Sequence, residues 1–231
     1  MATPFYVSPE QMMKDRAEYA RKGIARGRAL VAVEFAHGVV FVSENPSRSL
    51  YKTSEIYDRI GFAAVGRYNE FESMRVAGIR LADVKGYQYA REDVTAKSLA
   101  NAYSQALGAI FMGAEAKPYE VELLIAEVDG DEDAARHELY HILYDGSIVD
   151  ESRFVAIGGE TEPLSEVLES RWEPELDRDA AVRLCVAALG ETAGRDVAPD
   201  RLEVSGLDST RSRRRFFRLR DRELATALDA G

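Results

Sequence analysis

The spacing of apolar residues along this chain of 231 residues switches repeatedly between the period of a helix and that of a strand. Apolar residues three and four positions apart indicate a helix, whereas alternation or a short apolar run indicates a strand. The pattern predicts helices over 9–26, 69–81, 94–112, 163–172, 179–189 and 221–228. It predicts strands over 29–35, 39–43, 57–60, 62–66, 119–128, 138–144, 154–157, 201–207 and 214–220.

Polar residues at the predicted helix starts support this assignment. Ser8 is a suitable N-cap, Pro9 suits the first helical position, and Gln11 can complete a capping box. Asn69 and Asp93 are the N-caps we expect for the next two helices.

Blocks of strands alternate with pairs of helices, without the regular strand-helix-strand rhythm of a parallel sheet. This order favours an α+β fold with two stacked antiparallel sheets and a helix pair on each outer side, a four-layer α-β-β-α sandwich. The strands over 29–35 and 39–43 are apolar at nearly every position, as expected for strands covered on both faces. No linker or repeat divides the chain, so we expect a single domain over 1–231.

Composition narrows the class of protein. The chain has 30 Lys and Arg against 40 Asp and Glu, a formal net charge of -10, which argues against nonspecific nucleic-acid binding. No apolar run approaches the ~20 residues of a membrane span, and the first residues lack the pattern of a signal peptide, so a cytoplasmic location is expected. The single cysteine, Cys185, lies on an apolar helical face and is predicted to be a core residue rather than a nucleophile.

Three histidines are the candidate metal ligands. His137 and His141 are four residues apart in a predicted strand, whereas that spacing suits a metal ion on a helix, and His37 falls in a turn. We therefore expect solvated histidines at a strand edge, with no metal site and no cofactor.

Arginines are dense near the C-terminus, where they alternate with apolar residues. The segment contains Arg211, Arg213, Arg214, Arg215, Arg218, Arg220 and Arg222 around Phe216, Phe217 and Leu219. It could bind nucleic acid through phosphate contacts and stacking. We favour the alternative, in which Phe217 and Leu219 face the core and the arginines pair with the acidic residues of 160–175 on a solvated or subunit-contacting face. No catalytic constellation emerges from the residues alone.

Several segments together resemble a known family. SPEQMMKDRAEYARKGIARG resembles a signature of that family at Ser8, Pro9, Glu10, Glu18, Tyr19, Ala20 and Gly27. ALVAVEFAHGVVFVSENPSRS, YKTSEIYDRIGFAAVG, RYNEFESMRVAGIRLAD, AKPYEVELLIAEV, LYDGS and FVAIGG follow in the order of that family. The chain resembles 20S proteasome alpha subunits of the actinobacterial type over nearly its whole length.

The resemblance implies an Ntn-hydrolase-like sandwich and bears on catalysis. Catalytic beta-type relatives start their first strand with a threonine whose own amine activates its hydroxyl. The matching place here is near Arg28, and the resemblance makes Arg59 the counterpart of a supporting lysine and Glu44 that of a strand-end acid. An arginine stays protonated and cannot transfer the proton. The resemblance therefore implies a noncatalytic subunit whose partner, the beta subunit, supplies the threonine.

By the same resemblance, seven copies form a ring that templates assembly with rings of beta subunits. The helices within 69–112 supply the stacking surface, and 1–8 form a tail at the pore ahead of the helix over 9–26. The residues that the resemblance assigns to the gate are Phe5, Tyr6, Val7, Ser8, Pro9 and Tyr19.

A lysine between neighbouring subunits of such rings binds the C-terminal carboxylate of an activator, for example a ring-shaped ATPase. Lys52 is the candidate, with Glu18 and Gly27 as neighbours and Arg59 as the rival cation. Two other functions stay open: a stand-alone Ntn-type hydrolase, and a nucleic-acid-binding module that uses Arg211 to Arg222.

Overall fold

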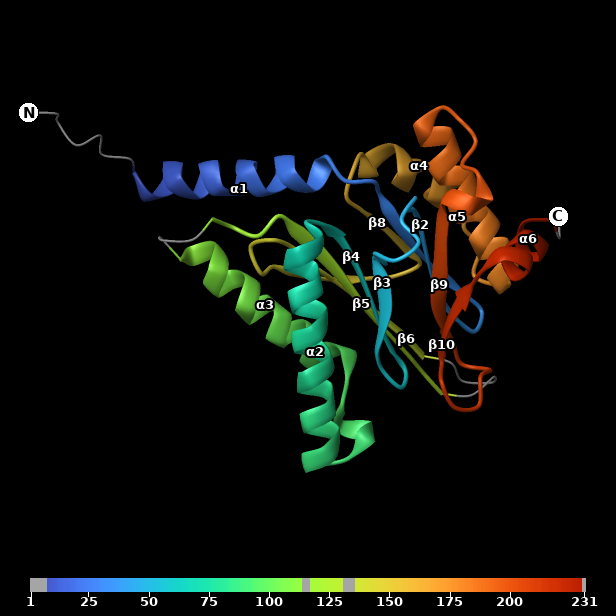
Figure 1. Ribbon diagram of the computed structural model, residues 1–231, viewed down its shortest axis with the longest axis horizontal. Coiled ribbons are helices and arrows are strands. Elements are labelled where there is room, and N and C mark those ends of the chain that lie inside the picture. Colours follow the sequence, from blue (N-terminus) through green and yellow to red (C-terminus); the bar gives the residue numbers. More distant parts are fainter. Residues whose placement is uncertain (1–7, 114–116, 131–135, 230–231) are drawn as a thin grey trace, which may run out of the picture.

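The computed structural model of the protein describes residues 8–113, 117–130 and 136–229. Two five-stranded antiparallel sheets lie face to face (Figure 1). The first has the order β10-β9-β2-β1-β8, with β1 (Leu30–Phe35), β2 (Gly38–Glu44), β8 (Phe154–Ile157), β9 (Leu202–Asp208) and β10 (Phe216–Leu219). The second has the order β3-β4-β5-β6-β7, with β3 (Thr53–Tyr57), β4 (Ile60–Gly66), β5 (Val121–Asp129), β6 (Arg136–Ile142) and β7 (Ile148–Glu151).

Helices cover both outer faces of this pair of sheets. The second sheet is covered by α2 (Tyr68–Gln88) and α3 (Ala96–Met112), and the first by α4 (Thr161–Arg171), α5 (Arg178–Ala193) and α6 (Asp221–Asp229). Two 3₁₀ turns, η1 (Arg91–Asp93) and η2 (Pro199–Arg201), precede α3 and β9. The remaining helix, α1 (Pro9–Ala25), lies across one end of the sandwich. The predicted four-layer α-β-β-α arrangement is confirmed.

The continuous apolar strands of the sequence are explained by burial on both faces. In β1, Val31 and Val33 pack against α4 and α5, whereas Leu30 and Ala32 pack against the second sheet. Every residue of β2 is buried. Because successive side chains of a strand point to opposite faces, only a strand between two apolar layers can be apolar throughout.

The start of α1 is capped as predicted, with one difference. Ser8 Oγ accepts a hydrogen bond from the Gln11 backbone N–H at 3.2 Å, and Pro9 is the first helical residue. The Gln11 side chain donates to Asp15 instead of reaching back, so the predicted reciprocal capping box is wrong. Ala20 and Ile24 anchor the helix in the core between the sheets.

The predicted N-caps of α2 and α3 are also wrong. Arg67 precedes α2 and makes no side-chain cap, whereas Thr95 caps α3 by accepting from the Ser98 N–H at 3.2 Å. Asp93 instead accepts from the Ala90 N–H and closes the turn η1. Short polar side chains can satisfy either kind of turn, so the sequence could not choose between them.

Two strands differ from the prediction. The strand expected over 57–60 ends at Tyr57 as β3, because Asp58 and Arg59 form the turn that leads into β4. The strand β7 was not predicted, since three of its four residues are exposed and it pairs only with β6 at the sheet edge. Strands with few apolar residues leave little periodic signal, and their pairing is decided by the neighbouring strand.

Candidate functional site

Lys52 lies at the N-terminal end of β1, on the segment that joins β2 to β3. Its Nζ donates to the Arg28 carbonyl at 2.8 Å and to Ser43 Oγ at 2.9 Å, and Ser43 Oγ donates to the Ala29 carbonyl at 2.8 Å. An ammonium group has three donors, and within the described part of the chain two of them find partners. Among the described residues, the third donor has no hydrogen-bond acceptor.

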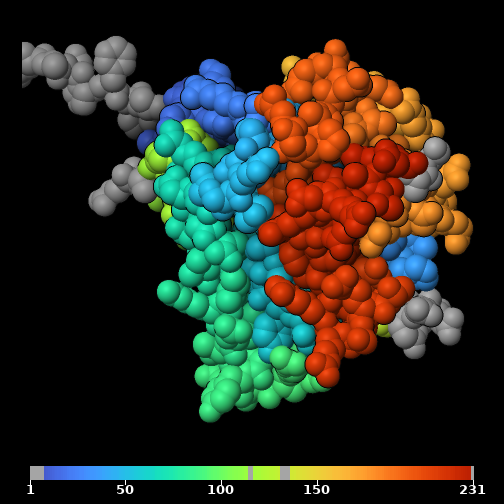
Figure 2. Space-filling model, turned by 45° about the vertical axis from the view of Figure 1, so that its right-hand side comes forward, coloured from blue at the N-terminus to red at the C-terminus, as the bar shows by residue number. Residues whose placement is uncertain are grey.

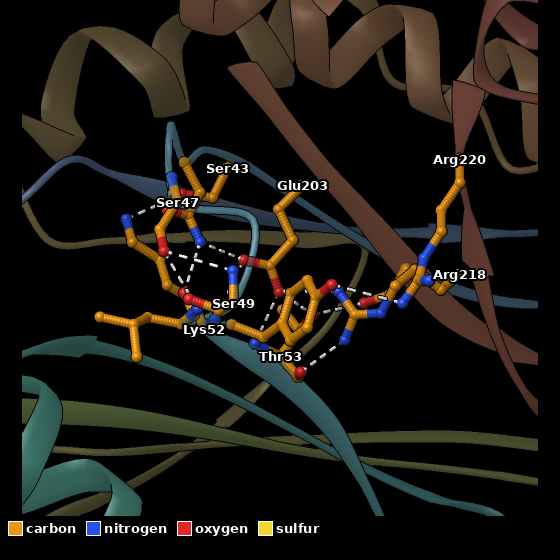
Figure 3. A network of polar contacts seen from close by, with 12 residues as sticks. Ser43, Ser47, Ser49, Lys52, Thr53, Glu203, Arg218 and Arg220 are labelled. Atoms are coloured by element: carbon orange, nitrogen blue, oxygen red, sulfur yellow. Dashed lines mark hydrogen bonds and ion pairs between the residues drawn. The ribbon is translucent and has the colours of Figure 1, made fainter. Parts of the chain in front are cut away.

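A buried carboxylate on β9 holds this segment (Figure 3). Glu203 accepts from the Lys52 N–H at 3.0 Å, the Thr53 N–H at 3.0 Å and Thr53 Oγ1 at 2.6 Å. It also accepts from Asn45 Nδ2 at 2.6 Å and from Arg218 at 2.9 Å. Burial alone raises the pKa of a carboxyl group, but these hydrogen bonds outweigh it and hold the pKa of Glu203 below its usual value.

Several charges surround Lys52. Burial lowers the pKa of Lys52 to about 8, with the charges of Glu203 and Glu44 acting upward and that of Arg28 acting downward. Glu44 itself is paired with Arg195 at 2.7 Å and Arg201 at 3.1 Å. At pH 7 Lys52 therefore stays mostly protonated while its proton is held less tightly than that of a solvated lysine.

The loop that precedes Lys52 reaches the surface. Asn45 Nδ2 donates to the Leu50 carbonyl at 2.8 Å, and Ser47 Oγ accepts from the Leu50 N–H at 3.0 Å, so the loop is internally bonded. In Figure 2 its light-blue atoms lie at the surface between α1 and the red C-terminal segment. A ligand can reach this region from outside the sandwich.

Arg59 does not lie at this site, which corrects the correspondence predicted for it. It lies in the turn after β3, where Nε donates to Glu127 at 2.5 Å and a terminal nitrogen donates to the Glu92 carbonyl at 3.1 Å. Burial would lower its pKa, but Glu127 raises it overall. The cation beside Arg28 is Lys52, because the residues between β2 and β3 form a loop that returns the chain to the start of β1.

Of the other predicted site residues, Pro9, Glu18 and Tyr19 lie on α1, Ser8 directly precedes this helix, and Gly27 follows it. Gly27 directly precedes Arg28, whereas Glu18 is nine residues upstream, about 13 Å away along the helix, and pairs with Lys22 at 2.6 Å. Within one chain Glu18 and Lys52 are therefore not brought together. The exposed ring of Tyr19 lies 6.0 Å from Lys117 Nζ, and Ser8 and Pro9 begin the helix. Phe5, Tyr6 and Val7 lie outside the described residues.

Part of the arginine-rich segment is engaged within the chain. Phe217 and Leu219 are buried as predicted. The predicted pairing with the acidic residues of 160–175 is wrong for Arg214 and Arg218, because among the described residues Arg214 pairs with Glu55 and Arg218 with Glu203. The two carboxylate partners lie on β3 and β9, which the fold brings close to the arginines, and the sequence could not show these pairs. A groove of about 600 Å³ follows the outer side of β10 and is bordered by Arg211, Arg220 and Arg222.

His137 and His141 lie on a strand as predicted, but they are not solvated residues at a sheet edge. They lie on β6, which is flanked by β5 and β7. His141 is partly buried, 3.5 Å from Glu122 and 3.6 Å from Glu151. Burial would lower its pKa, but the two carboxylates raise it to about 9. His141 is therefore a partly buried cation held between two carboxylates.

Cys185 lies on α5 and is fully buried in the core between the first sheet and its helices, as predicted, and burial raises the pKa of its thiol. Within residues 8–113, 117–130 and 136–229, no group of three or more His, Cys, Asp or Glu side chains is arranged to hold a metal ion. None of the described helices is long and apolar enough to span a membrane.

Two antiparallel sheets between helix layers, with a polar site at the start of the first strand, have the architecture of the Ntn-hydrolase class. A sequence model described as "Proteasome subunit" matches residues 24–205. The chain therefore belongs to the proteasome subunit family.

Its relatives include proteins named proteasome subunit alpha from several actinobacteria. The one from Kineococcus radiotolerans is 58% identical, over 99% of this chain and 98% of its own length. The one from Nocardioides sp. is 56% identical, over 99% of this chain and 90% of its own. The one from Streptomyces avermitilis is 55% identical, over 100% of this chain and 92% of its own. The chain is thus similar throughout to alpha-type subunits of the proteasome core.

Sequence reasoning missed the residues that hold Lys52 in place, namely Ser43, Glu203 and Arg218. One signal could have been used for Glu203: a carboxylate that occupies a single position within LEVSGL, an otherwise weakly polar strand. A charge in such a strand must be paired when it is buried. The partner itself, 151 residues away, could not be identified from the sequence.

Proposed function

We propose that this chain is a noncatalytic alpha-ring subunit of a 20S proteasome core. Seven copies form a ring that templates assembly with beta subunits, gates substrate entry and docks an activator, for example a ring-shaped ATPase. The proposal extends to the whole of 1–231 as one alpha-type domain and to a cytoplasmic location.

The residues at the start of β1 support the proposal that the chain has no catalytic threonine of its own. Arg28 and Ala29 connect α1 directly to Leu30, so the backbone there is an ordinary peptide whose carbonyl accepts from Lys52. A threonine-type hydrolase needs a nucleophile with a free amine at this place. Here the equivalent position has neither, and the proteolytic threonine is assigned to the beta partner.

An exposed apolar surface supports the stacking of rings. The C-terminal half of α2 exposes Leu81, Val84 and Tyr87, and Tyr89 follows directly; Tyr87 is 92% exposed and Tyr89 72% exposed. An exposed apolar group of this kind is typical of a protein interface. We assign it to contacts with the beta ring.

The gate is assigned to residues 1–8, with Ser8, Pro9 and Tyr19 fixing the direction in which the tail leaves α1 and Phe5, Tyr6 and Val7 at the pore. α1 is long, lies across one end of the sandwich and is fixed there by Ala20 and Ile24. This position of α1 supports a gate at that end of the sandwich.

Docking is assigned to Lys52, because its third donor can bind the terminal carboxylate of an activator by a charge-assisted hydrogen bond. Gly27 lies beside it, and we assign Glu18 to the same pocket from the neighbouring subunit. Arg59 is the weaker candidate, since Glu127 already neutralises its charge.

The two alternative functions have less support. A stand-alone Ntn-type hydrolase would require cleavage before a Thr, Ser or Cys at the start of the first strand, and Arg28, Ala29 and Leu30 occupy that place. A nucleic-acid-binding module would require free arginines in 211–222, and Arg214 and Arg218 are paired within the chain.

Native mass spectrometry of the chain alone and mixed with its beta partner, with a fluorogenic peptide assay on each sample, tests the proposal. We expect a four-ring particle with equal numbers of both subunits, and peptide hydrolysis only in the mixture. Deletion of residues 1–8 should accelerate hydrolysis by the assembled particle. Cleavage by the chain alone, or a chain that ignores the beta partner, would overturn the proposal.

A further inference from the structure

Lys52 is bonded to both sheets through its backbone. Its carbonyl accepts from the Ala64 N–H of β4 at 2.9 Å, which ties it to the second sheet. Its N–H donates to Glu203 of β9 at 3.0 Å, which ties it to the first sheet. The Cα from which the ammonium extends is thus fixed between two rigid elements, and Glu203 supplies one of the two ties.

Thr53, the residue after Lys52, strengthens the attachment of the backbone to Glu203. The Thr53 N–H and hydroxyl both donate to the same carboxylate, and Ser205 of β9 donates to Thr53 Oγ1 at 2.8 Å. Because consecutive amides bond to the two oxygens of one carboxylate, the backbone at Lys52 cannot rotate without breaking both bonds. Charge-assisted bonds of this kind are stronger than bonds between neutral groups.

Arg218 holds the carboxylate from the far side. One guanidinium nitrogen donates to Glu203 at 2.9 Å, and another donates to the Thr53 carbonyl at 2.7 Å. The guanidinium carbon also lies 4.1 Å from the centre of the Tyr51 ring. Figure 3 shows these side chains converging from β9, β10 and the loop. The cluster is a built network of buried partners rather than a chance surface contact.

We propose that Glu203 is a positioning residue for the docking site: by fixing the backbone of Lys52 to β9, it holds the ammonium at the start of β1 with one donor free for a terminal carboxylate. This inference rests on the docking function proposed above. Glu203 does not touch the ligand, so its effect must act through the place and the charge of Lys52.

The charge of Glu203 also affects the pKa of Lys52, so the pH dependence of docking can be measured. A residue with a purely structural role would leave this pH dependence unchanged. The charged groups that face Lys52 are Arg28, Glu44 and Glu203, with Arg218 behind Glu203. Of these, the charge of Glu203 is the largest upward influence on the pKa of Lys52. Without it, Lys52 would lose its proton at a lower pH, and docking would fail at a pH that the unsubstituted chain tolerates.

The test uses particles assembled with the beta partner. A fluorescent peptide with the last eight residues of the activating ATPase, and the same peptide with a C-terminal amide, are titrated at pH 6.5 and pH 8.5. The Glu203→Gln particle should bind the carboxylate peptide roughly ten-fold more weakly at pH 8.5, with a smaller loss at pH 6.5. Glu55→Gln is the matched control, because Glu55 pairs with Arg214 on the same face of the molecule without contacting Lys52.

The outcomes separate the two proposals. If the unsubstituted particle binds carboxylate and amide peptides equally, or if Lys52→Gln binds as well as the unsubstituted particle, the docking function proposed for Lys52 fails. If both controls behave as expected but Glu203→Gln matches the unsubstituted particle at both pH values, only the positioning role is overturned. A loss that is equal for both peptides or at both pH values would overturn it too, since it would indicate general damage.

A milder variant covers the case in which Glu203→Gln does not assemble. Thr53→Val keeps the shape of the side chain but removes one donor to Glu203, and it should weaken carboxylate binding by about three-fold. The acylation rate of Lys52, followed by mass spectrometry against pH, should at the same time show a changed titration midpoint. Unchanged binding and an unchanged midpoint in Thr53→Val would overturn the proposal.

Discussion

Two cations at opposite ends of β3 differ in the kind of group to which their side chains are bonded. Lys52, just before the strand, donates from Nζ to a carbonyl and a hydroxyl and keeps one donor without a partner among the described residues. Arg59, just after it, is bonded to the buried carboxylate of Glu127. A cation that is neutralised by its own fold stabilises the fold, whereas a cation held by neutral acceptors keeps its charge for a ligand. This difference is the reason why we propose Lys52, and not Arg59, as the docking residue.

The largest effect expected from the comparison concerns Arg59. Arg59→Met leaves Glu127, which is 6% exposed, with the Ala96 N–H at 2.6 Å as its remaining partner. Breaking a buried pair in this way should lower the free energy of unfolding by about 3 kcal/mol, measured by urea denaturation. Arg91→Met removes an exposed pair with Asp58 near the same turn and should change it by less than about 0.5 kcal/mol. If Arg59→Met lowers the free energy of unfolding by less than about 1 kcal/mol, Arg59 is not a structural cation in the sense of this comparison.

The second effect concerns Lys52. Lys52→Gln should weaken binding of the carboxylate peptide by about 10- to 100-fold in a fluorescence titration, because one charge-assisted bond is lost. The free energy of unfolding should change by less than about 1 kcal/mol, because no buried carboxylate loses its only partner. Lys14→Gln, which removes an exposed lysine paired with Glu10, is the control and should bind as the unsubstituted particle does. If Lys52→Gln binds the peptide normally but has a much lower free energy of unfolding, Lys52 has a structural role and not the docking role.

The third effect is a pH dependence of docking that distinguishes Lys52 from Arg59. If Lys52 is the docking residue as proposed, the docking form is its ammonium, which is present well below the pKa of about 8 and is lost as the pH rises through it. Binding should therefore weaken by about ten-fold between pH 7 and pH 9. An arginine stays protonated over this range, so docking at Arg59 would give a flat profile. A flat profile would thus favour Arg59 as the docking cation.

The smallest effect concerns Glu18, which is exposed on α1 and pairs with Lys22 one turn away. Glu18→Gln should change the free energy of unfolding of the chain by less than about 0.5 kcal/mol in a urea titration, because surface pairs contribute little. Lys22→Gln should behave in the same way. A loss above about 1 kcal/mol in either variant would show that the pair is part of the fold and not free to contribute to a pocket.

The sequence by itself determined the layers of this protein and the class to which it belongs. The sequence shows three features directly, because each depends on residues that are near one another in the chain. They are the mostly apolar residues of β1 and β2, the helical spacing of apolar residues in α2 to α5, and the order of the family segments. The start of α1 at Ser8 and Pro9 was predicted for the same reason.

Only the tertiary structure decided which cation lies beside the start of β1 and what holds it there. The contact between Lys52 and Arg28 depends on the loop between β2 and β3, and the contact with Glu203 joins residues 151 positions apart. The edge strand β7 and the partners of Arg214 and Arg218 were likewise set by neighbours in space. Side chains that are polar in sequence can be solvated, paired or poised for a ligand, and only the packing of distant strands determines which of these they become.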